Sequence, residues 1–120
     1  MLDEKKRELR LKQEQAEEEF AHQRRKQAEM EEALVERKNH AIQLVEEIAD
    51  RSMYYLRKVS DEADLIRVSN PVIDRAKDDL VQRYHYTRER LEEEWEQTEK
   101  EYRTVQRTCE AEFEELRRDV

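Results

Sequence analysis

Apolar residues recur at steps of three and four through the second half of the chain, a spacing typical of one helical face. At about 100° per residue, nearly all of them fall within about 40° of Leu91. The extra four-residue steps are stutters, which relax a left-handed supercoil toward a straighter pair of helices. The pattern predicts a helix over about 71–118 with one narrow seam. The seam residues are Ile73, Ala76, Leu80, Tyr84, Thr87, Leu91, Trp95, Thr98, Tyr102, Val105, Cys109, Phe113, Leu116 and Val120.

Residues 30–59 carry two apolar rows at helical spacing. We assign the first row to the hairpin seam, and it holds Met30, Leu34, Ala41, Leu44, Ile48, Tyr55 and Val59. The second row lies about 60–120° further round the helix. We assign it to a partner interface, and it holds Val35, Ile42, Ala49, Met53 and Leu56. Together the rows cover a wider arc than one antiparallel partner helix needs.

Residues 3–29 are rich in helix formers but poor in large apolar side chains. Leu2, Leu9 and Ala16 keep a seven-residue spacing, whereas Gln23 and Gln27 occupy the next seam positions. We expect a solvated helical extension that overhangs the hairpin. The alternative is a segment that becomes ordered on a partner.

The hinge is expected at Ser69-Asn70-Pro71, which holds the only proline of a chain without glycine. Proline suits the first turn of a helix and disfavours its interior, and Asn70 or Ser69 can cap the new helix. Helix one then spans about 3–68 and helix two about 71–118. Alternatively, Ser60-Asp61-Glu62 caps a fresh helix, but nothing in 60–68 forbids a continuous helix one.

These elements predict an all-α fold: an antiparallel two-helix hairpin, coiled-coil-like, with an N-terminal helical overhang, in a single unit over 1–120. With the hinge at 69–71, Trp95 faces Leu44 and Leu91 faces Ile48. In the same register, Leu80 faces Val59 and Cys109 faces Met30.

Composition agrees with long helices, because 47% of the 120 residues are charged and 7% are aromatic. The net charge is −8, and residues 91–120 hold more than twice as many acidic as basic side chains. Nucleic-acid binding is not expected without a basic stripe, nor is membrane insertion without a long apolar run. The polar N-terminus lacks a signal-peptide core, so we expect a cytoplasmic protein, with co-export alongside a cargo left open.

No pattern for catalysis or cofactor binding stands out. Glu19-x-x-His22 matches half of a di-iron motif, and Glu36 lies one turn from His40, but a metal site needs more ligands. We expect no enzyme activity, no metal and no cofactor. The single Cys109 is interpreted as a buried apolar residue. Trp95 is either a core anchor or a hot spot for a partner.

The sequence therefore indicates a helix-bundle interaction module with Val35, Ile42, Ala49, Met53 and Leu56 as its interface. Its layout resembles the LXG-associated α-helical proteins of Gram-positive type VII secretion, which are themselves similar to WXG-type hairpins. The layout comprises a length near 120, a polar arm, a first helix ending near Ile48-Ala49-Asp50, a central break and a Glu/Arg-rich second helix.

The resemblance implies a partner that binds the helical N-terminal domain of an LXG toxin, stabilises it or targets it for export, and works beside a second small helical protein. The chain departs from the WXG pattern, since it has no Trp-x-Gly turn. It also lacks the export signal, because Phe113 precedes Arg117 and Tyr102 precedes Gln106 by four residues. Two other classes stay open: a self-assembling coiled-coil scaffold that forms homo-oligomers without cargo, and a fragment of a longer filament protein.

Overall fold

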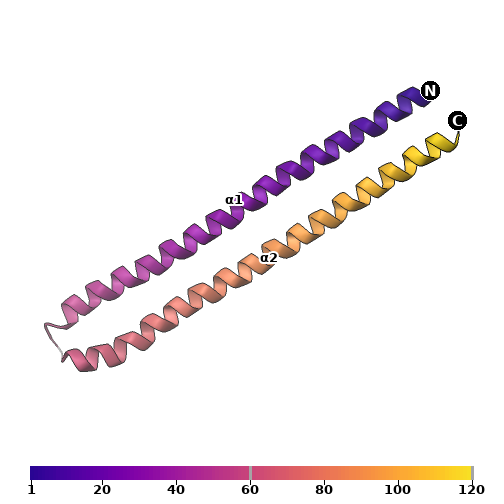
Figure 1. The fold of residues 1–120 in the computed structure, drawn as a ribbon. Helices are drawn as coiled ribbons and strands as arrows, with labels where there is room; N and C mark the ends of the chain where they lie inside the picture. Colours follow the sequence, from indigo (N-terminus) through magenta and orange to yellow (C-terminus); the bar gives the residue numbers. More distant parts are fainter. Residues whose placement is uncertain (60, 120) are drawn as a thin grey trace. The chain divides into compact units, whose positions relative to one another are not determined.

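The computed structural model describes residues 1–59 and 61–119, and this part of the chain forms two α-helices (Figure 1). Helix α1 spans Leu2–Leu56 and helix α2 spans Glu62–Arg118. The all-α helical hairpin is therefore confirmed. The chain divides into two units. Unit 1 consists of Met1–Glu29 and Leu91–Val120, and unit 2 consists of Met30–Arg90.

The turn of the hairpin lies between Leu56 and Glu62. Helix α1 tightens as it ends, because the N–H groups of Lys58 and Val59 donate to carbonyls three residues earlier, at 3.3 and 3.0 Å. Such bonds satisfy carbonyls that a helix end would otherwise leave unpaired. An ion pair between Arg57 and Glu62 joins the two sides of the turn at 3.3 Å.

Helix α2 begins at Glu62, which agrees with the alternative prediction of a new helix after residue 60. The Asp61 carbonyl accepts a hydrogen bond from the Leu65 N–H at 3.1 Å, which places Asp61 at the cap position. Glu62 and Asp64 follow in the first turn, where negative charge complements the helix dipole. Ser60, the first residue of the suggested cap, lies outside the described residues, as does Val120 at the end of the predicted seam.

The hinge predicted at Ser69-Asn70-Pro71 is wrong, because all three residues lie inside α2. Helix one ends at Leu56 rather than near 68. Pro71 cannot donate a hydrogen bond to the Arg67 carbonyl, and an interior proline costs a helix about 3 kcal/mol. The helix nevertheless continues through it.

The predicted N-terminal overhang is also wrong, because residues 1–29 pack against residues 91–119 within unit 1. The Phe20 ring stacks on Trp95 and Tyr102, with ring centroids 5.2 and 4.2 Å apart. The side-chain amide of Gln27 donates to the Leu91 carbonyl at 3.2 Å. Leu9 is 7% exposed and Cys109 is 0% exposed. Trp95 and Leu91 thus contact residues of α1 that lie closer to the N-terminus than a hinge at 69–71 predicts. The difference is roughly twenty positions, or about 30 Å of helix.

In unit 2, residues 30–56 of α1 pair with residues 62–90 of α2. Glu46 forms an ion pair with Lys77 at 3.0 Å. The Lys38 ammonium lies 4.4 Å from the ring centroid of Tyr84, a cation–π distance. Leu65 is the buried apolar residue of this unit. Its other inward side chains are half-buried, so both polar contacts and partial apolar burial hold the pair together.

Candidate functional site

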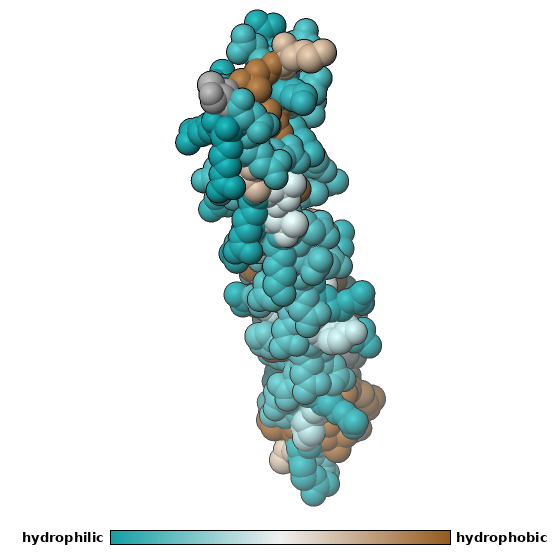
Figure 2. Space-filling model, turned by 90° about the vertical axis from the view of Figure 1, so that its right-hand side faces the viewer, coloured by the Kyte–Doolittle hydropathy of each residue, from teal (hydrophilic) through white to brown (hydrophobic). Residues whose placement is uncertain are grey.

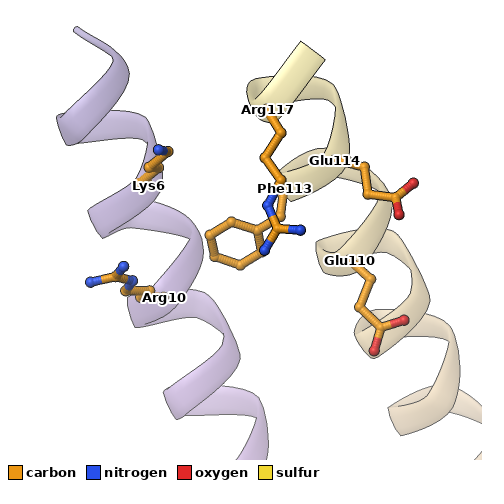
Figure 3. Close-up of a pocket in the computed structure, with 6 residues that line it drawn as sticks. All are labelled: Lys6, Arg10, Glu110, Phe113, Glu114 and Arg117. Carbon is orange, nitrogen blue, oxygen red and sulfur yellow. The ribbon is translucent and has the colours of Figure 1, made fainter. Parts of the chain in front are cut away.

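Unit 1 has a charged hollow near the helix ends, of about 460 Å³. Figure 3 shows the residues that line it, namely Lys6, Arg10, Glu110, Phe113, Glu114 and Arg117. The carboxylates of Glu110 and Glu114 point away from α1 (Figure 3). A catalytic site needs acid, base and nucleophile aimed at one position. These charged groups do not converge, so the hollow offers no such arrangement.

A search of residues 1–59 and 61–119 finds no group of three or more His, Cys, Asp or Glu side chains placed to hold a metal ion. The same residues contain no helix that is long and apolar enough to cross a bilayer.

Unit 2 carries an apolar groove of about 350 Å³ between its two helices. It is lined by Val45, Ile48, Ala49, Ser52, Val68, Ser69, Val72, Ile73 and Ala76. Ser52 and Ser69 supply its only polar side chains. An apolar groove of this kind is suited to the apolar side chains of another helix.

The walls of the groove are exposed. Ile48 on α1 is 63% exposed, and Val68 and Val72 on α2 are 64% and 65% exposed. Figure 2 shows hydrophobic residues near both ends of the view, and those at the bottom lie at the level at which Figure 1 draws the turn. Large apolar side chains gathered on a surface mark interaction sites more often than isolated ones do.

Leu44 and Tyr55 extend this surface along α1. At about 100° per residue, both lie within about 40° of Ile48 around the helix axis. They are 44% and 65% exposed. We call Leu44, Ile48, Tyr55, Val68 and Val72, together with the groove between them, the docking face.

Neither apolar row of α1 lies wholly where the sequence places it. Leu44, Ile48 and Tyr55, assigned by sequence to the hairpin seam, are exposed. Met30, from the same row, is exposed as well, whereas Leu34 is half-buried.

The expected interface row lies closer to α2. Ile42, Ala49 and Met53 are half-buried, and Ala49 lines the groove floor. Val35 and Leu56 are exposed. The row is thus divided between the inside of unit 2 and its edge, and it does not form one continuous outer surface.

The seam of α2 lies where the sequence places it on the helix. Leu80 and Tyr84 are half-buried in unit 2. In unit 1, Leu91, Cys109 and Leu116 are buried, and five further members are half-buried: Trp95, Thr98, Tyr102, Val105 and Phe113. Thr87, a seam position in unit 2, is exposed. Trp95 stacks on Phe20, which makes it part of the unit 1 seam.

The stutters in the apolar spacing of α2 could have indicated which row of α1 faces α2. Four-residue steps in one helix of a pair require similar steps in the other, since both must keep facing each other. Half-buried residues of α1 follow one another at four-residue spacing, first Leu34, Lys38 and Ile42, and then Val45, Ala49 and Met53. A strict seven-residue extension leads instead through Ile48 and Tyr55, which the structure exposes.

Comparisons with protein-family models, with curated proteins and with solved structures found no match for this chain. The resemblance to type VII secretion partners therefore stays a prediction from layout.

Proposed function

We propose that this protein is a non-enzymatic helical partner that binds an α-helix of another protein on the docking face of unit 2. The observation that supports the proposal is the row of exposed apolar residues beside the groove. Ile48, Val68 and Val72 remain more than 60% exposed although they line one continuous apolar surface. Covering them with a helix would remove apolar area from water at about 25 cal/mol per Å².

The mode of binding is helix-in-groove. An amphipathic partner helix places residues at i, i+3, i+4 and i+7 into a groove of this kind. The pair of helices in unit 2 would then become part of a bundle of three or more helices, which buries more core than two helices can.

Part of the layout supports one class of partner, the helical N-terminal domain of an LXG toxin. The structure keeps two long helices, a central break and a Glu/Arg-rich second helix, whereas the first helix ends at Leu56 and not near Ile48-Ala49-Asp50. In that role the protein would stabilise the toxin domain or target it for type VII export, together with a second small helical protein. The arrangement would fit a chain without an export signal of its own, since its companion would supply one.

The experiment is co-expression of the full chain with helical proteins encoded beside its gene, followed by affinity purification and mass measurement. We expect a stable complex with one of them. Leu44→Asp with Ile48→Asp should abolish that complex, because two carboxylates would be buried without partners. Leu11→Asp is the matched control, since Leu11 is exposed in unit 1. A complex that survives the double substitution contradicts the proposal.

The scaffold alternative is tested by the same measurement without co-expressed partners. The exposed apolar surface of unit 2 would also serve contact between copies of the chain. A single discrete homo-oligomer that ignores all neighbours, and that Leu44→Asp with Ile48→Asp dissociates, would favour a self-assembling rod over a cargo partner.

A further inference from the structure

The charged residues of α1 are sorted around the docking face. Between residue 30 and the end of α1 at Leu56, the Lys and Arg side chains within about 80° of Ile48 around the helix axis are Arg37, Lys38 and Arg51. A fourth base, Lys58, follows the end of the helix and lies beside Tyr55. The acidic side chains of the same stretch all lie about 100° or more from Ile48. They are Glu31, Glu32, Glu36, Glu46, Glu47 and Asp50. The exposed apolar row of α1 is therefore bordered by one sign of charge.

Three of the four bases are exposed, namely Arg37, Arg51 and Lys58. Lys38 is half-buried and lies over Tyr84. We call the three exposed residues the basic rim. The Lys58 ammonium lies 4.6 Å from the ring centroid of Tyr54 and 5.7 Å from that of Tyr55. Positive charge is thus held directly against the aromatic end of the docking face.

On α2, the charged residues on the same side as Val72 are not of one sign. Asp79 and Arg83 both lie within about 20° of Val72 around the helix axis and carry opposite charges. Charge selection at this surface would therefore come from α1.

We propose, on the basis of the function inferred above, that the occupant of the docking face is an amphipathic α-helix whose apolar stripe is bordered by Asp and Glu. Such a helix would bury its stripe in the groove and place carboxylates beside the basic rim. Complementary charges at an interface rim raise the association rate and exclude wrong partners. A helix bordered by Lys or Arg would meet the rim with like charge.

A second copy of this chain fits the surface less well. Two copies meeting through α1 would bring their basic rims together. The acidic part of the chain, residues 91–119, has no free apolar stripe to offer, because Leu91, Trp95 and Cys109 already face α1 within unit 1.

A lipid surface is the other class of partner that a basic-edged apolar face can attract. The net charge of −8, and the Asp79 carboxylate on the same side of α2 as Val72, oppose adsorption to an anionic membrane. The observations therefore favour an acidic helix, and lipid binding becomes an outcome of the test.

The test uses the full chain and two synthetic helical peptides of about 20 residues, or about 30 Å of helix. Both carry the same apolar stripe, bordered by Glu in one peptide and by Lys in the other. Binding is measured by fluorescence anisotropy. We expect the Glu-bordered peptide to bind about tenfold more tightly at low salt, the size expected from three rim-exposed pairs. The ratio should fall toward one at about 0.5 M salt.

Two triple variants assign the preference to the rim. Arg37→Glu, Arg51→Glu and Lys58→Glu together should reverse the order of the two peptides. Arg24→Glu, Arg25→Glu and Lys26→Glu make the same change of charge on exposed residues of unit 1, and this control should keep the original order. Circular dichroism establishes that both variants are helical.

Three results would overturn the inference, and they separate it from the proposed function. Equal binding of both peptides, lost on Ile48→Asp, would leave the helix-binding function and remove the charge preference. Binding of neither peptide would remove both. Rim-dependent binding to vesicles of phosphatidylcholine with about 30% phosphatidylserine, without any preference between peptides, would assign the face to lipid.

Discussion

The two units use their apolar residues in opposite ways. Unit 1 turns them inward: apart from Leu65, the buried apolar residues of the described chain all belong to it. Unit 2 leaves many of them exposed. Apart from Met1 and Leu11, every large apolar residue that is exposed in the described chain lies between Met30 and Tyr86.

The difference follows from composition along α1. Residues 2–29 offer few large apolar side chains, and Leu9 and Phe20 are used in the seam. Residues 30–59 offer two rows, and one antiparallel neighbour covers only part of them. The unit with fewer apolar residues is therefore complete by itself, whereas the richer unit retains a surface for a partner.

Thiol labelling should give the largest contrast between the units. Cys109 is fully buried, so its reaction requires unit 1 to open. We expect labelling at least about a hundredfold slower than that of Ile48→Cys in a Cys109→Ala background, which corresponds to opening free energies near 3 kcal/mol. Both rates are measured with a chromogenic disulfide reagent on the native chain. Comparable rates would mean that unit 1 is not closed.

Truncating the aromatic stack should weaken unit 1. Phe20→Ala removes a half-buried ring that contacts Trp95 and Tyr102. We expect a loss of about 2–3 kcal/mol, below the 3–5 kcal/mol typical of fully buried rings. Urea unfolding followed by circular dichroism measures it. Leu11→Ala, at an exposed position of the same arm, should change stability by less than about 0.5 kcal/mol. Equal effects would contradict the paired arm.

Replacing the proline tests where the hairpin turns. With Pro71 inside α2, Pro71→Ala restores a donor for the Arg67 carbonyl and should stabilise the chain by about 1–3 kcal/mol. Asn70→Ala, which keeps its backbone N–H, should gain less than about 0.7 kcal/mol. Thermal and urea unfolding measure both. A loss of stability for Pro71→Ala would instead suit a proline at the first position of a helix.

The smallest effect is expected from the docking face itself. Ile48→Ala should change the free energy of unfolding of the isolated chain by less than about 0.5 kcal/mol, because Ile48 is mostly exposed. Leu91→Ala is the matched substitution in unit 1 and should cost about 2–3 kcal/mol. Urea titrations of the two variants decide the point. Similar costs would show that Ile48 is buried in solution.

Much of the local structure could be predicted from the sequence. Long helices follow from a chain that lacks glycine and is rich in Glu, Lys, Arg and Gln. The α2 seam follows from its apolar period, since Leu91 and Cys109 are buried where the period places them. The docking face could be predicted only in part: an excess of apolar surface on residues 30–59 was evident, but which row stays exposed was not.

By itself, the sequence determined the helices and the face that α2 buries, because propensity and periodicity act over one or two turns. The tertiary structure decided the position of the turn, and with it the pairing of Phe20 with Trp95 and the exposure of Ile48. A turn at 69–71 spares the proline but leaves the N-terminal arm without a neighbour. A turn after Leu56 gives helices of 55 and 57 residues. Their matched lengths allow both ends to pair, and this long-range burial offsets the local cost of Pro71.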